Sequence, residues 1–321
     1  MNYLKSIKIR GFSSCLFLTL ISLLITVSCS TLSPVTSLRE VPKRAAGIDA
    51  VRVDWQPFAI RETSGLAYFA GKIQKPQLEF WALKIDLTAP ELRIVVGGGN
   101  SGDPLGTSNS TWVSGFVRRN DLLAGINTNP FDPVSGKEGE KRTIIGIAVS
   151  EGRLLAPPNS RFDALVFYTN GKAAILSQAE LFSLGDMESI YNAVGGFNIV
   201  LQEGKIPRRL LADKTPGQDM PKQDMPRHPR SAAGLSADGK TLYLLAIDGR
   251  RFGSIGATEA EIGLLLKQLG ASEGLNFDGG GSTSLALRYP DGKVRPVNIP
   301  IHRQIPGNER GVAVCLGISL F

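Results

Sequence analysis

The sequence has 321 residues, of which 42% are hydrophobic, enough to bury the core of one large domain or two small ones. Its 36 basic and 29 acidic residues give a formal net charge of +7. No run of lysine and arginine is interleaved with aromatic residues, which argues against nucleic-acid binding. The charge supports at most a mild preference for anionic ligands.

The first 28 residues have the pattern of a secretory signal peptide. Lys5, Lys8 and Arg10 form a basic start, and residues 15–27, CLFLTLISLLITV, are almost wholly apolar. A membrane-spanning helix needs about 20 apolar residues, so this shorter run fits a signal-peptide core. We therefore expect export and a soluble remainder of the chain. Loss of the three basic residues reduces the charge from +7 to +4.

A cysteine follows the apolar run directly. Cys29 comes after Thr26-Val27-Ser28, which resembles a bacterial lipobox, in which the cysteine is lipidated and becomes the first mature residue. Ordinary cleavage between residues 28 and 30 is the alternative. We expect a periplasmic protein or a membrane-anchored lipoprotein, with the lipid anchor as its only membrane contact. The resulting division is a signal peptide (1–28), a flexible Ser/Thr/Pro-rich tether (29–48) and a folded domain (49–321).

The other cysteines give no covalent framework. Cys15 lies inside the signal peptide, and Cys315 lies in an apolar strand pattern, VAVCLGISL, where we expect an inert buried thiol. One internal cysteine can form neither a disulfide framework nor a cysteine-based metal site.

The first two thirds of the domain predict mainly short strands. Alternating apolar residues predict a strand over 78–86, and turn signals separate further short apolar segments. Ser177 and Glu180 form a capping-box pattern at the start of a short helix. Gly195-Gly196 predicts a turn that leads into a strand ending at Leu201. The remaining expected elements are a helix within 110–123 and strands over 92–96, 144–149, 165–168 and 173–176.

Residues 212–230 lack apolar periodicity and contain four prolines and a direct repeat, QDMP. We expect an exposed loop, which is either a tolerated insertion or a lid over a site.

The C-terminal third predicts a strand, a helix and a second strand. Residues 242–247, LYLLAI, form a continuous apolar run typical of a central strand buried on both faces. Thr258 and Glu261 open an amphipathic helix that Gly270 ends. Because short strands dominate, we expect the α+β class: a single domain with a mixed, largely antiparallel sheet and a few flanking helices.

The segment 276–284, NFDGGGSTS, combines a carboxylate with a glycine turn. Asp278 stands where the strand pattern breaks, and the three following glycines allow a ligand to approach bare backbone N–H groups that can bind an anion. Ser282 and Thr283 add hydroxyl groups. A carboxylate beside such a loop suits cleavage of a phosphate-linked sugar. A tight turn with a solvated aspartate is the alternative interpretation.

Two further polar clusters, HPR at 228–230 and DGR at 248–250, flank predicted strands within about sixty residues of this segment. Together with the glycine pair at 195–196 and ERGV at 309–312, the ordered motifs resemble the phosphodiester glycosidase family. Upstream, AGIN, which ends at Asn127, resembles that family's asparagine-containing segment. The resemblance covers roughly residues 80–321.

The resemblance implies a hydrolase that cuts a sugar from a phosphate-linked glycoconjugate in the bacterial envelope. Glycoside cleavage commonly uses two carboxyl groups, for which Asp278 is the first candidate, Asp248 the second and Glu261 the third. The capping-box position of Glu261 also explains that residue structurally. Further candidates for substrate and phosphate binding are Arg230, Arg250, His228, Asn276, Gly280, Gly281, Ser282, Thr283 and Asn127.

Two other functions remain open. One is a non-catalytic protein for carbohydrate binding or exopolysaccharide assembly on the same scaffold. The other is a metal-dependent phosphodiesterase that uses Asp248 and Asp278. Two scattered histidines and the absence of a D-x-D-x-D-G loop lead us to expect no metal and no other cofactor. The expected partner is a carbohydrate phosphate, and the sequence gives no indication of an oligomeric state.

Overall fold

The computed structural model describes residues 48–58, 63–99, 102–184, 187–211 and 225–321, which belong to one compact unit, Arg44–Phe321. The expected signal peptide, almost all of the tether, Cys29 and residues 212–224 of the proline-rich loop lie outside these described residues. In the described part of the chain, no helix has the length and apolar character needed to cross a membrane.

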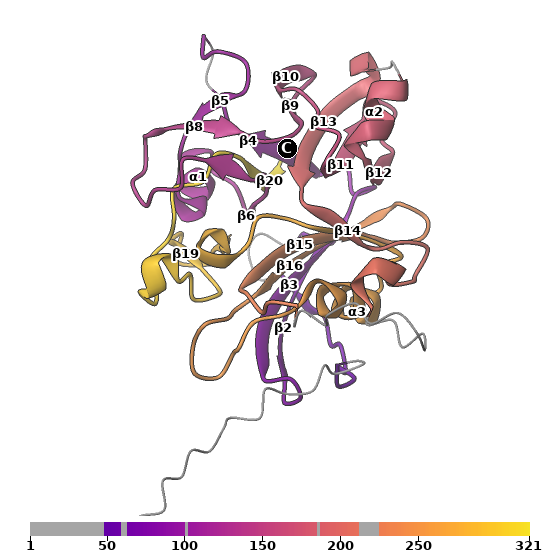
Figure 1. Ribbon diagram of the computed structural model, residues 1–321, viewed down its shortest axis with the longest axis vertical. Coiled ribbons are helices and arrows are strands. Elements are labelled where there is room, and N and C mark those ends of the chain that lie inside the picture. The colour runs from indigo at the N-terminus through magenta and orange to yellow at the C-terminus, as the bar shows by residue number, and fades with distance from the viewer. Residues whose placement is uncertain (1–47, 59–62, 100–101, 185–186, 212–224) are drawn as a thin grey trace, which may run out of the picture. The chain divides into compact units, whose positions relative to one another are not determined.

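The described strands form one seven-stranded sheet, two five-stranded sheets and one three-stranded sheet (Figure 1). Every ladder between these strands is antiparallel, and an isolated bridge between Ile301 and Asn308 is parallel. The α+β class and the largely antiparallel pairing are thus confirmed, although the strands are distributed over several sheets instead of one.

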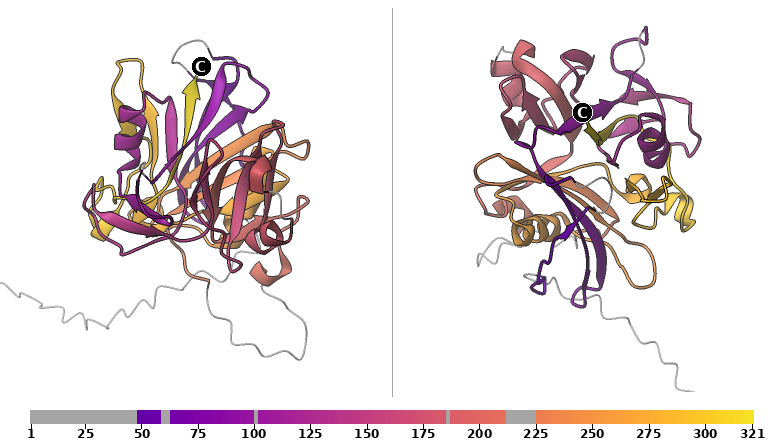
Figure 2. Two further views of the ribbon diagram at one scale, coloured as in Figure 1. Left: turned by 90° about the horizontal axis from the view of Figure 1, so that it is seen from above. Right: turned by 180° about the vertical axis from the view of Figure 1, so that it is seen from behind.

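The seven-stranded sheet carries the elements that lead to the site. In spatial order it contains β1 (Gln56–Pro57), β2 (Leu66–Ile73), β3 (Leu78–Asp86), β16 (Thr241–Ile247), β15 (Arg230–Leu235), β17 (Glu273–Asn276) and β14 (Asn198–Leu201). The view from behind shows the purple β2–β3 hairpin of this sheet (Figure 2). As the apolar run predicted, β16 is a central strand, buried except at its first residue and paired on both edges.

The other sheets pack around this one. One five-stranded sheet contains β10 (Arg153–Ala156), β9 (Ala148–Ser150), β13 (Ile190–Gly196), β11 (Asp163–Tyr168) and β12 (Ala173–Ser177). The other contains β19 (Val294–Pro296), β18 (Leu285–Arg288), β6 (Ala124–Asn127), β20 (Cys315–Leu320) and β4 (Leu92–Gly97). The three-stranded sheet contains β5 (Thr107–Asn109), β8 (Lys141–Ile144) and β7 (Phe131–Asp132).

Three α-helices flank the sheets in the described residues: α1 (Val113–Arg119), α2 (Gln178–Leu184) and α3 (Glu259–Leu269). Short 3₁₀ turns occur at η1 (Met187–Ser189), η2 (Arg208–Leu210), η3 (Gly280–Ser282) and η4 (His302–Gln304). The predicted caps of α3 are confirmed, because Thr258 and Glu261 form a complete capping box and Gly270 ends the helix in the left-handed conformation.

Buried hydrophobic side chains of the described residues form two main clusters, one larger than the other. The larger one joins buried side chains of the seven-stranded sheet to those of β4, β6, β18 and β20, with Phe116 of α1 and Phe277 among them. The smaller one lies between the seven-stranded sheet and α3, whose Ile262, Leu265 and Leu266 are fully buried. α3 connects β16 to β17 across β15, so these two strands run parallel to each other with β15 antiparallel between them.

That arrangement brings distant segments to one edge. Arg230, the first residue of β15, pairs with Ile247, the last residue of β16, and Ala232 pairs with Asn276 at the end of β17. The segments that precede β15 and follow β16 and β17 therefore emerge at the same end of the sheet. These are the three polar clusters that the sequence singled out.

Two sequence predictions of local structure were wrong. Gly195 and Gly196 do not form a turn but end β13, where a Cβ on Gly195 would lie 2.7 Å from the Asn129 side chain. The single strand expected over 144–149 is split, because Gly146 takes a φ of +82° between β8 and β9. The helix expected within 110–123 is confirmed as α1, which has seven residues, and Asp121 follows it with a φ of +50°.

Candidate active site

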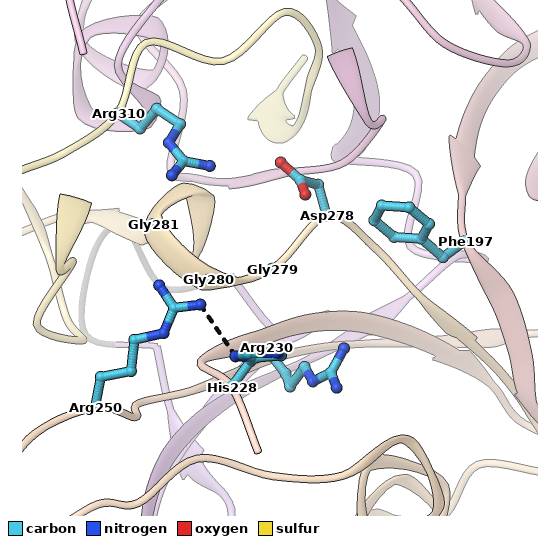
Figure 3. A pocket seen from close by; sticks show the side chains of 9 residues that line it. All are labelled: Phe197, His228, Arg230, Arg250, Asp278, Gly279, Gly280, Gly281 and Arg310. Carbon is cyan, nitrogen blue, oxygen red and sulfur yellow. Dashed lines mark hydrogen bonds between the residues drawn. The ribbon is translucent and has the colours of Figure 1, made fainter. Parts of the chain in front are cut away.

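A pocket of about 260 Å³ opens where the three polar clusters meet. Three arginines, one histidine, one phenylalanine and one aspartate line it, together with three consecutive glycines. We call it the arginine pocket (Figure 3), and its lining residues are Phe197, His228, Arg230, Arg250, Asp278, Gly279, Gly280, Gly281 and Arg310.

Asp278 supplies the carboxylate among these lining residues. Its backbone is held at the end of β17, because its N–H donates to the carbonyl of Thr128 and its carbonyl accepts from Asn127 Nδ2 at 2.7 Å. Burial raises the pKa of Asp278 to about 6, while the Ser282 hydroxyl and the positive charges of Arg310 and Arg230 act against that rise. A carboxyl group with such a pKa changes its charge close to neutral pH.

The arginines reach the pocket from three different segments, and each is held in place by further contacts. Arg230 is buried and donates through Nε to the carbonyl of Ala257 at 3.0 Å and through Nη2 to the carbonyl of Pro226. Arg310 donates to His302 Nδ1 at 3.0 Å and to the hydroxyl of Ser282 at 3.1 Å. The guanidinium groups are therefore positioned before any ligand arrives, which reduces the entropy lost on binding.

The third arginine is held by the histidine of the pocket. Arg250 stands in the left-handed region with a φ of +58°, and its Nη2 lies 3.0 Å from His228 Nδ1. Burial and the two neighbouring arginines lower the pKa of His228, which favours the neutral ring. Since a guanidinium group can only donate, Nδ1 must accept and Nε2 must carry the proton. His228 thus offers an N–H donor as well as a support for Arg250.

The glycines of the turn after Asp278 are needed for two different reasons. Gly280 has a φ of +62°, which favours glycine. Gly281 lies so close to Arg310 that a Cβ would come within 2.5 Å of Nη2. The turn thus leaves space for the Arg310 guanidinium group beside the backbone.

Phe197 forms the remaining wall of the pocket. Its backbone N–H donates to the carbonyl of Asn276 at 2.7 Å, and its ring packs edge-on against Phe162 with centroids 5.8 Å apart. In Figure 3 the guanidinium groups of Arg250 and Arg310 lie on one side of Asp278 and the Phe197 ring lies on the other. The pocket therefore has a cationic side and an aromatic side with the carboxylate between them.

Two predicted carboxylates do not line this pocket. Asp248 is 1% exposed, and its carboxylate accepts hydrogen bonds from Arg251 Nε at 2.8 Å, from the Ile299 N–H and from Asn298 Nδ2. Glu261 is also buried, where it completes the capping box of α3 and forms an ion pair with Arg227. Both carboxylates have structural partners in the described residues.

Four residues predicted to contact the substrate, Asn127, Asn276, Ser282 and Thr283, do not line the pocket but lie next to residues that do. Asn127 is fully buried, and its Oδ1 accepts from the Ser231 hydroxyl at 2.6 Å and from the Ser284 N–H at 3.1 Å. It thus joins β6 to two segments of the site. Ser282 donates toward Asp278 and accepts from Arg310. Asn276 Oδ1 and Thr283 Oγ1 are buried without a hydrogen-bond partner in the described part of the chain.

Sequence reasoning did not place Phe197 in the site, and it left Arg310 open between a functional role and a structural ion pair with Glu309. The adjacent Glu309 suggests an ion pair with Arg310, but Glu309 accepts hydrogen bonds from Ser114 and Ser284 instead. The available signal was the short ERG motif before the last strand, which does not indicate the direction of the side chain. Within residues 48–58, 63–99, 102–184, 187–211 and 225–321, no three His, Cys, Asp or Glu side chains are grouped so that they could hold a metal ion.

Relatives in sequence are distant. Over 223 residues the chain is 28% identical to the SPbeta prophage-derived uncharacterized protein YomE of Bacillus subtilis (strain 168). This match covers 67% of the chain but 30% of YomE, so the chain spans less than a third of that relative's length.

Several solved structures share the fold. The catalytic domain of zebrafish N-acetylglucosamine-1-phosphodiester α-N-acetylglucosaminidase, auto-inhibited by its pro-peptide, matches with a TM-score of 0.58 and 18% identity, over 83% of this chain and 87% of that one. A hypothetical protein from Synechocystis matches with a TM-score of 0.58 and 16% identity, over 85% and 64%. A putative exported protein from Burkholderia pseudomallei matches with 0.55 and 17%, over 75% and 74%.

The model of one protein family matches residues 120–319, which is more than half of the chain and includes every residue of the arginine pocket. The order of the motifs and the convergence of the strand ends agree with this match. The chain belongs to the phosphodiester glycosidase family.

Proposed function

We propose that this protein hydrolyses the bond between the anomeric carbon of a sugar and a phosphate oxygen in a phosphodiester-linked glycoconjugate. The observation that carries the proposal is the composition of the arginine pocket, in which three arginines face one aspartate whose pKa is raised to about 6. The name of the zebrafish enzyme with the same fold describes a reaction of this class. At 18% identity, that similarity supports the fold alone.

The cationic side of the pocket fits the phosphate group. A guanidinium group can donate two parallel hydrogen bonds to phosphate oxygens, and three of them exceed the charge of one diester. Asp278 offsets one of these charges when it is ionised. The Nε2–H of His228 and the backbone of the glycine turn add uncharged donors.

The carboxylate and the aromatic ring fit the sugar. Asp278 lies between Phe197 and the guanidinium groups of Arg250 and Arg310, so a sugar that stacks on the Phe197 ring places its anomeric carbon toward the carboxylate. Phosphate is a good leaving group, and the arginines stabilise its developing charge. In its ionised form Asp278 assists at the anomeric carbon, either as nucleophile or as the base that activates water.

The overall reaction uses one water molecule. The bond between the anomeric carbon and oxygen breaks, its electron pair leaves with the phosphate as a monoester, and the sugar gains the hydroxyl group of water. A phosphodiesterase would instead break a phosphorus–oxygen bond.

An isotope experiment separates these reactions. When N-acetylglucosamine-1-phosphate methyl diester is turned over in H₂¹⁸O, we expect the label at the anomeric hydroxyl of the sugar as it is first released, read by mass spectrometry before exchange. Label found in the phosphate product would overturn the proposal in favour of phosphodiester cleavage. Saturable binding of the diester without turnover would support a carbohydrate-binding protein.

We further propose that the protein acts in the bacterial cell envelope, anchored by a lipid on Cys29. The support is the basic and apolar pattern of residues 1–28, followed by the lipobox-like cysteine. Cys29→Ser is expected to move the protein from the membrane fraction to the soluble periplasmic or secreted fraction. Unchanged membrane fractionation of this variant would contradict lipidation.

A further inference from the structure

A second cavity, of about 390 Å³, lies beyond the aromatic side of the arginine pocket. It is formed by the start of β11, the end of β12, the first turn of α2 and strand β14, together with Arg209 of η2. We call it the polar pocket. The residues on which the argument depends are Arg161, Asp163, Glu180, Asn198 and Arg209.

The two pockets differ in charge. The polar pocket has two arginines, Arg161 and Arg209, and two carboxylates, Asp163 and Glu180. The arginine pocket has three arginines and one carboxylate. A phosphate group fits the arginine pocket better, whereas the balanced polar pocket fits an uncharged ligand with many hydroxyl groups, which both donate and accept hydrogen bonds.

The pockets are separated by the segment around Phe197 and Phe162. Phe197 lines the arginine pocket and the next residue, Asn198, lines the polar pocket. The ring of Phe197 packs on Phe162, whose neighbours Arg161 and Asp163 line the polar pocket.

A chain of polar contacts crosses the same wall. Asn198 Nδ2 lies 3.3 Å from Glu259 Oε2, and Glu259 Oε1 lies 3.9 Å from Arg230 Nη1 in the arginine pocket. The two pockets are thus neighbours on either side of the junction between Phe197 and β14.

The arginines and Phe197 flank Asp278 in a fixed order, and this order indicates which end of a bound substrate points toward the polar pocket. Arg250 and Arg310 lie against Gly280 and Gly281, after Asp278 in the chain, while Phe197 is bonded to Asn276, before it. The phosphate side and the sugar side therefore lie on opposite sides of Asp278. Because the polar pocket is reached past Phe197, it lies on the sugar side.

We propose that the polar pocket binds an uncharged sugar unit attached to the sugar whose bond is cut. The substrate is then an oligosaccharide joined to phosphate through C1 of its reducing-end unit, and the released product is an oligosaccharide. This inference rests on the proposed function and specifies its substrate class.

Two groups of the polar pocket are available for such a ligand. Asp163 Oδ2 accepts from the N–H of Ile199 at 2.5 Å, and Oδ1 has no hydrogen-bond partner in the described ranges. The Arg161 side chain is exposed, and its guanidinium group likewise has no partner among the residues that the structure describes. Truncation of the Arg161 side chain is therefore expected to disturb the fold little.

The test compares matched substrates. Methyl diesters of 1-phosphates are prepared from N-acetylglucosamine and chitobiose, from glucose and maltose, and from glucose and lactose, and kcat/KM is measured for each. At least one disaccharide diester is expected to exceed its monosaccharide partner in kcat/KM by about tenfold, roughly the contribution of one hydrogen bond to a charged group. Arg161→Ala should bring that ratio close to one. The exposed Arg118→Ala on α1, which lines neither pocket, should keep it.

A binding measurement makes the outcome independent of turnover. Calorimetry with free chitobiose, maltose and lactose should detect binding of at least one disaccharide to the full chain, weakened about tenfold in Arg161→Ala. If the monosaccharide diesters are cleaved but no disaccharide binds or is preferred, the inference fails and the proposed function stands. If no diester is cleaved but a disaccharide binds through Arg161, the proposed function fails, and the polar pocket remains a sugar site.

Discussion

The ends of β16 and β17 are similar in sequence, but the aspartates that follow them have different roles in the structure. Each strand has a buried end followed, directly or after one residue, by an aspartate and a glycine, Asp248-Gly249 and Asp278-Gly279. Asp248 is enclosed by Arg251, Asn298 and the N–H of Ile299, whereas Asp278 lines a pocket with three arginines. The same dipeptide at a strand end thus gives a structural anchor in one place and a reactive group in the other.

The difference arises in the residues that follow. After Asp248, the left-handed conformation of Arg250 sends this side chain to the arginine pocket, while Arg251 turns back to pair with Asp248 and Glu79. After Asp278 come three glycines, which have no side chains that could fold back, and the cations that act on its carboxylate, Arg310 and Arg230, come from distant segments. The turn after Asp278 supplies the Ser282 hydroxyl but no cation, so its carboxylate is not closed off by an ion pair from its own turn.

The largest expected effect is on catalysis at the β17 end. Asp278→Asn removes the proposed nucleophile or base while keeping a side chain of the same size. We expect kcat to fall by about 10³-fold or more, measured as release of sugar from a sugar-1-phosphodiester. Binding of inorganic phosphate should persist, because the arginines remain. Turnover within a few-fold of the unchanged protein would remove Asp278 from the mechanism.

The same substitution at the β16 end should act on stability. Asp248→Asn leaves Arg251 without one of its buried partners, and we expect the free energy of unfolding to fall by about 2–4 kcal/mol, measured by urea denaturation. Activity per folded molecule should stay within a few-fold. Asp121→Asn is the matched control, since Asp121 is 74% exposed in its pair with Arg288 and should lose about 0.5 kcal/mol or less. Lost turnover with an unchanged unfolding curve would place Asp248 in the chemistry.

An intermediate effect is expected in the glycine turn. Gly281→Ala puts a methyl group where Arg310 Nη2 now lies, and the flexible guanidinium group has to move. We expect kcat/KM and the affinity for phosphate to fall by about 10–100-fold, with little change in the melting temperature. In a double-mutant cycle with Arg310→Lys, the two losses should be less than additive, because both act through one side chain. Fully additive losses would show that the turn acts independently of Arg310.

Much of the fold and part of the site could be predicted from the sequence, because local patterns govern them. The continuous apolar run of β16, the alternation of β3 and the capping box of α3 are local signals, and each gave the observed element. The convergence of Arg230, Arg250 and Asp278 followed from their places beside neighbouring strand ends.

The remainder depends on contacts between distant segments. Arg310 enters the pocket from a segment 32 residues after Asp278, and Phe197 enters from the residue directly before β14, which pairs with β17 at the opposite edge from β15. The glycine pair at the end of β13 lies in a strand because Asn129 occupies the space beside it. No local pattern encodes these neighbours, so sequence reasoning ranked Asp278 before Asp248 but kept both as catalytic candidates.

The smallest expected effect is a pH-dependent difference in stability, and it tests the same two aspartates. The pKa of Asp278 is raised from 3.8 to about 6 in the folded protein, so between these values the folded state binds more protons than the unfolded state. The free energy of unfolding therefore falls as pH rises through this window. The amide side chain of the Asp278→Asn variant does not titrate, so the free energy of unfolding of this variant lacks that decrease. Relative to the unchanged protein, the variant should gain about 1–2 kcal/mol between pH 4 and pH 7, after discounting for partial solvent exposure. Urea denaturation at both pH values measures the gain, and Asp248→Asn should stay less stable at both, because it loses buried partners. Equal stability differences at pH 4 and pH 7 for Asp278→Asn would mean that its carboxyl group pays no desolvation cost in the pocket.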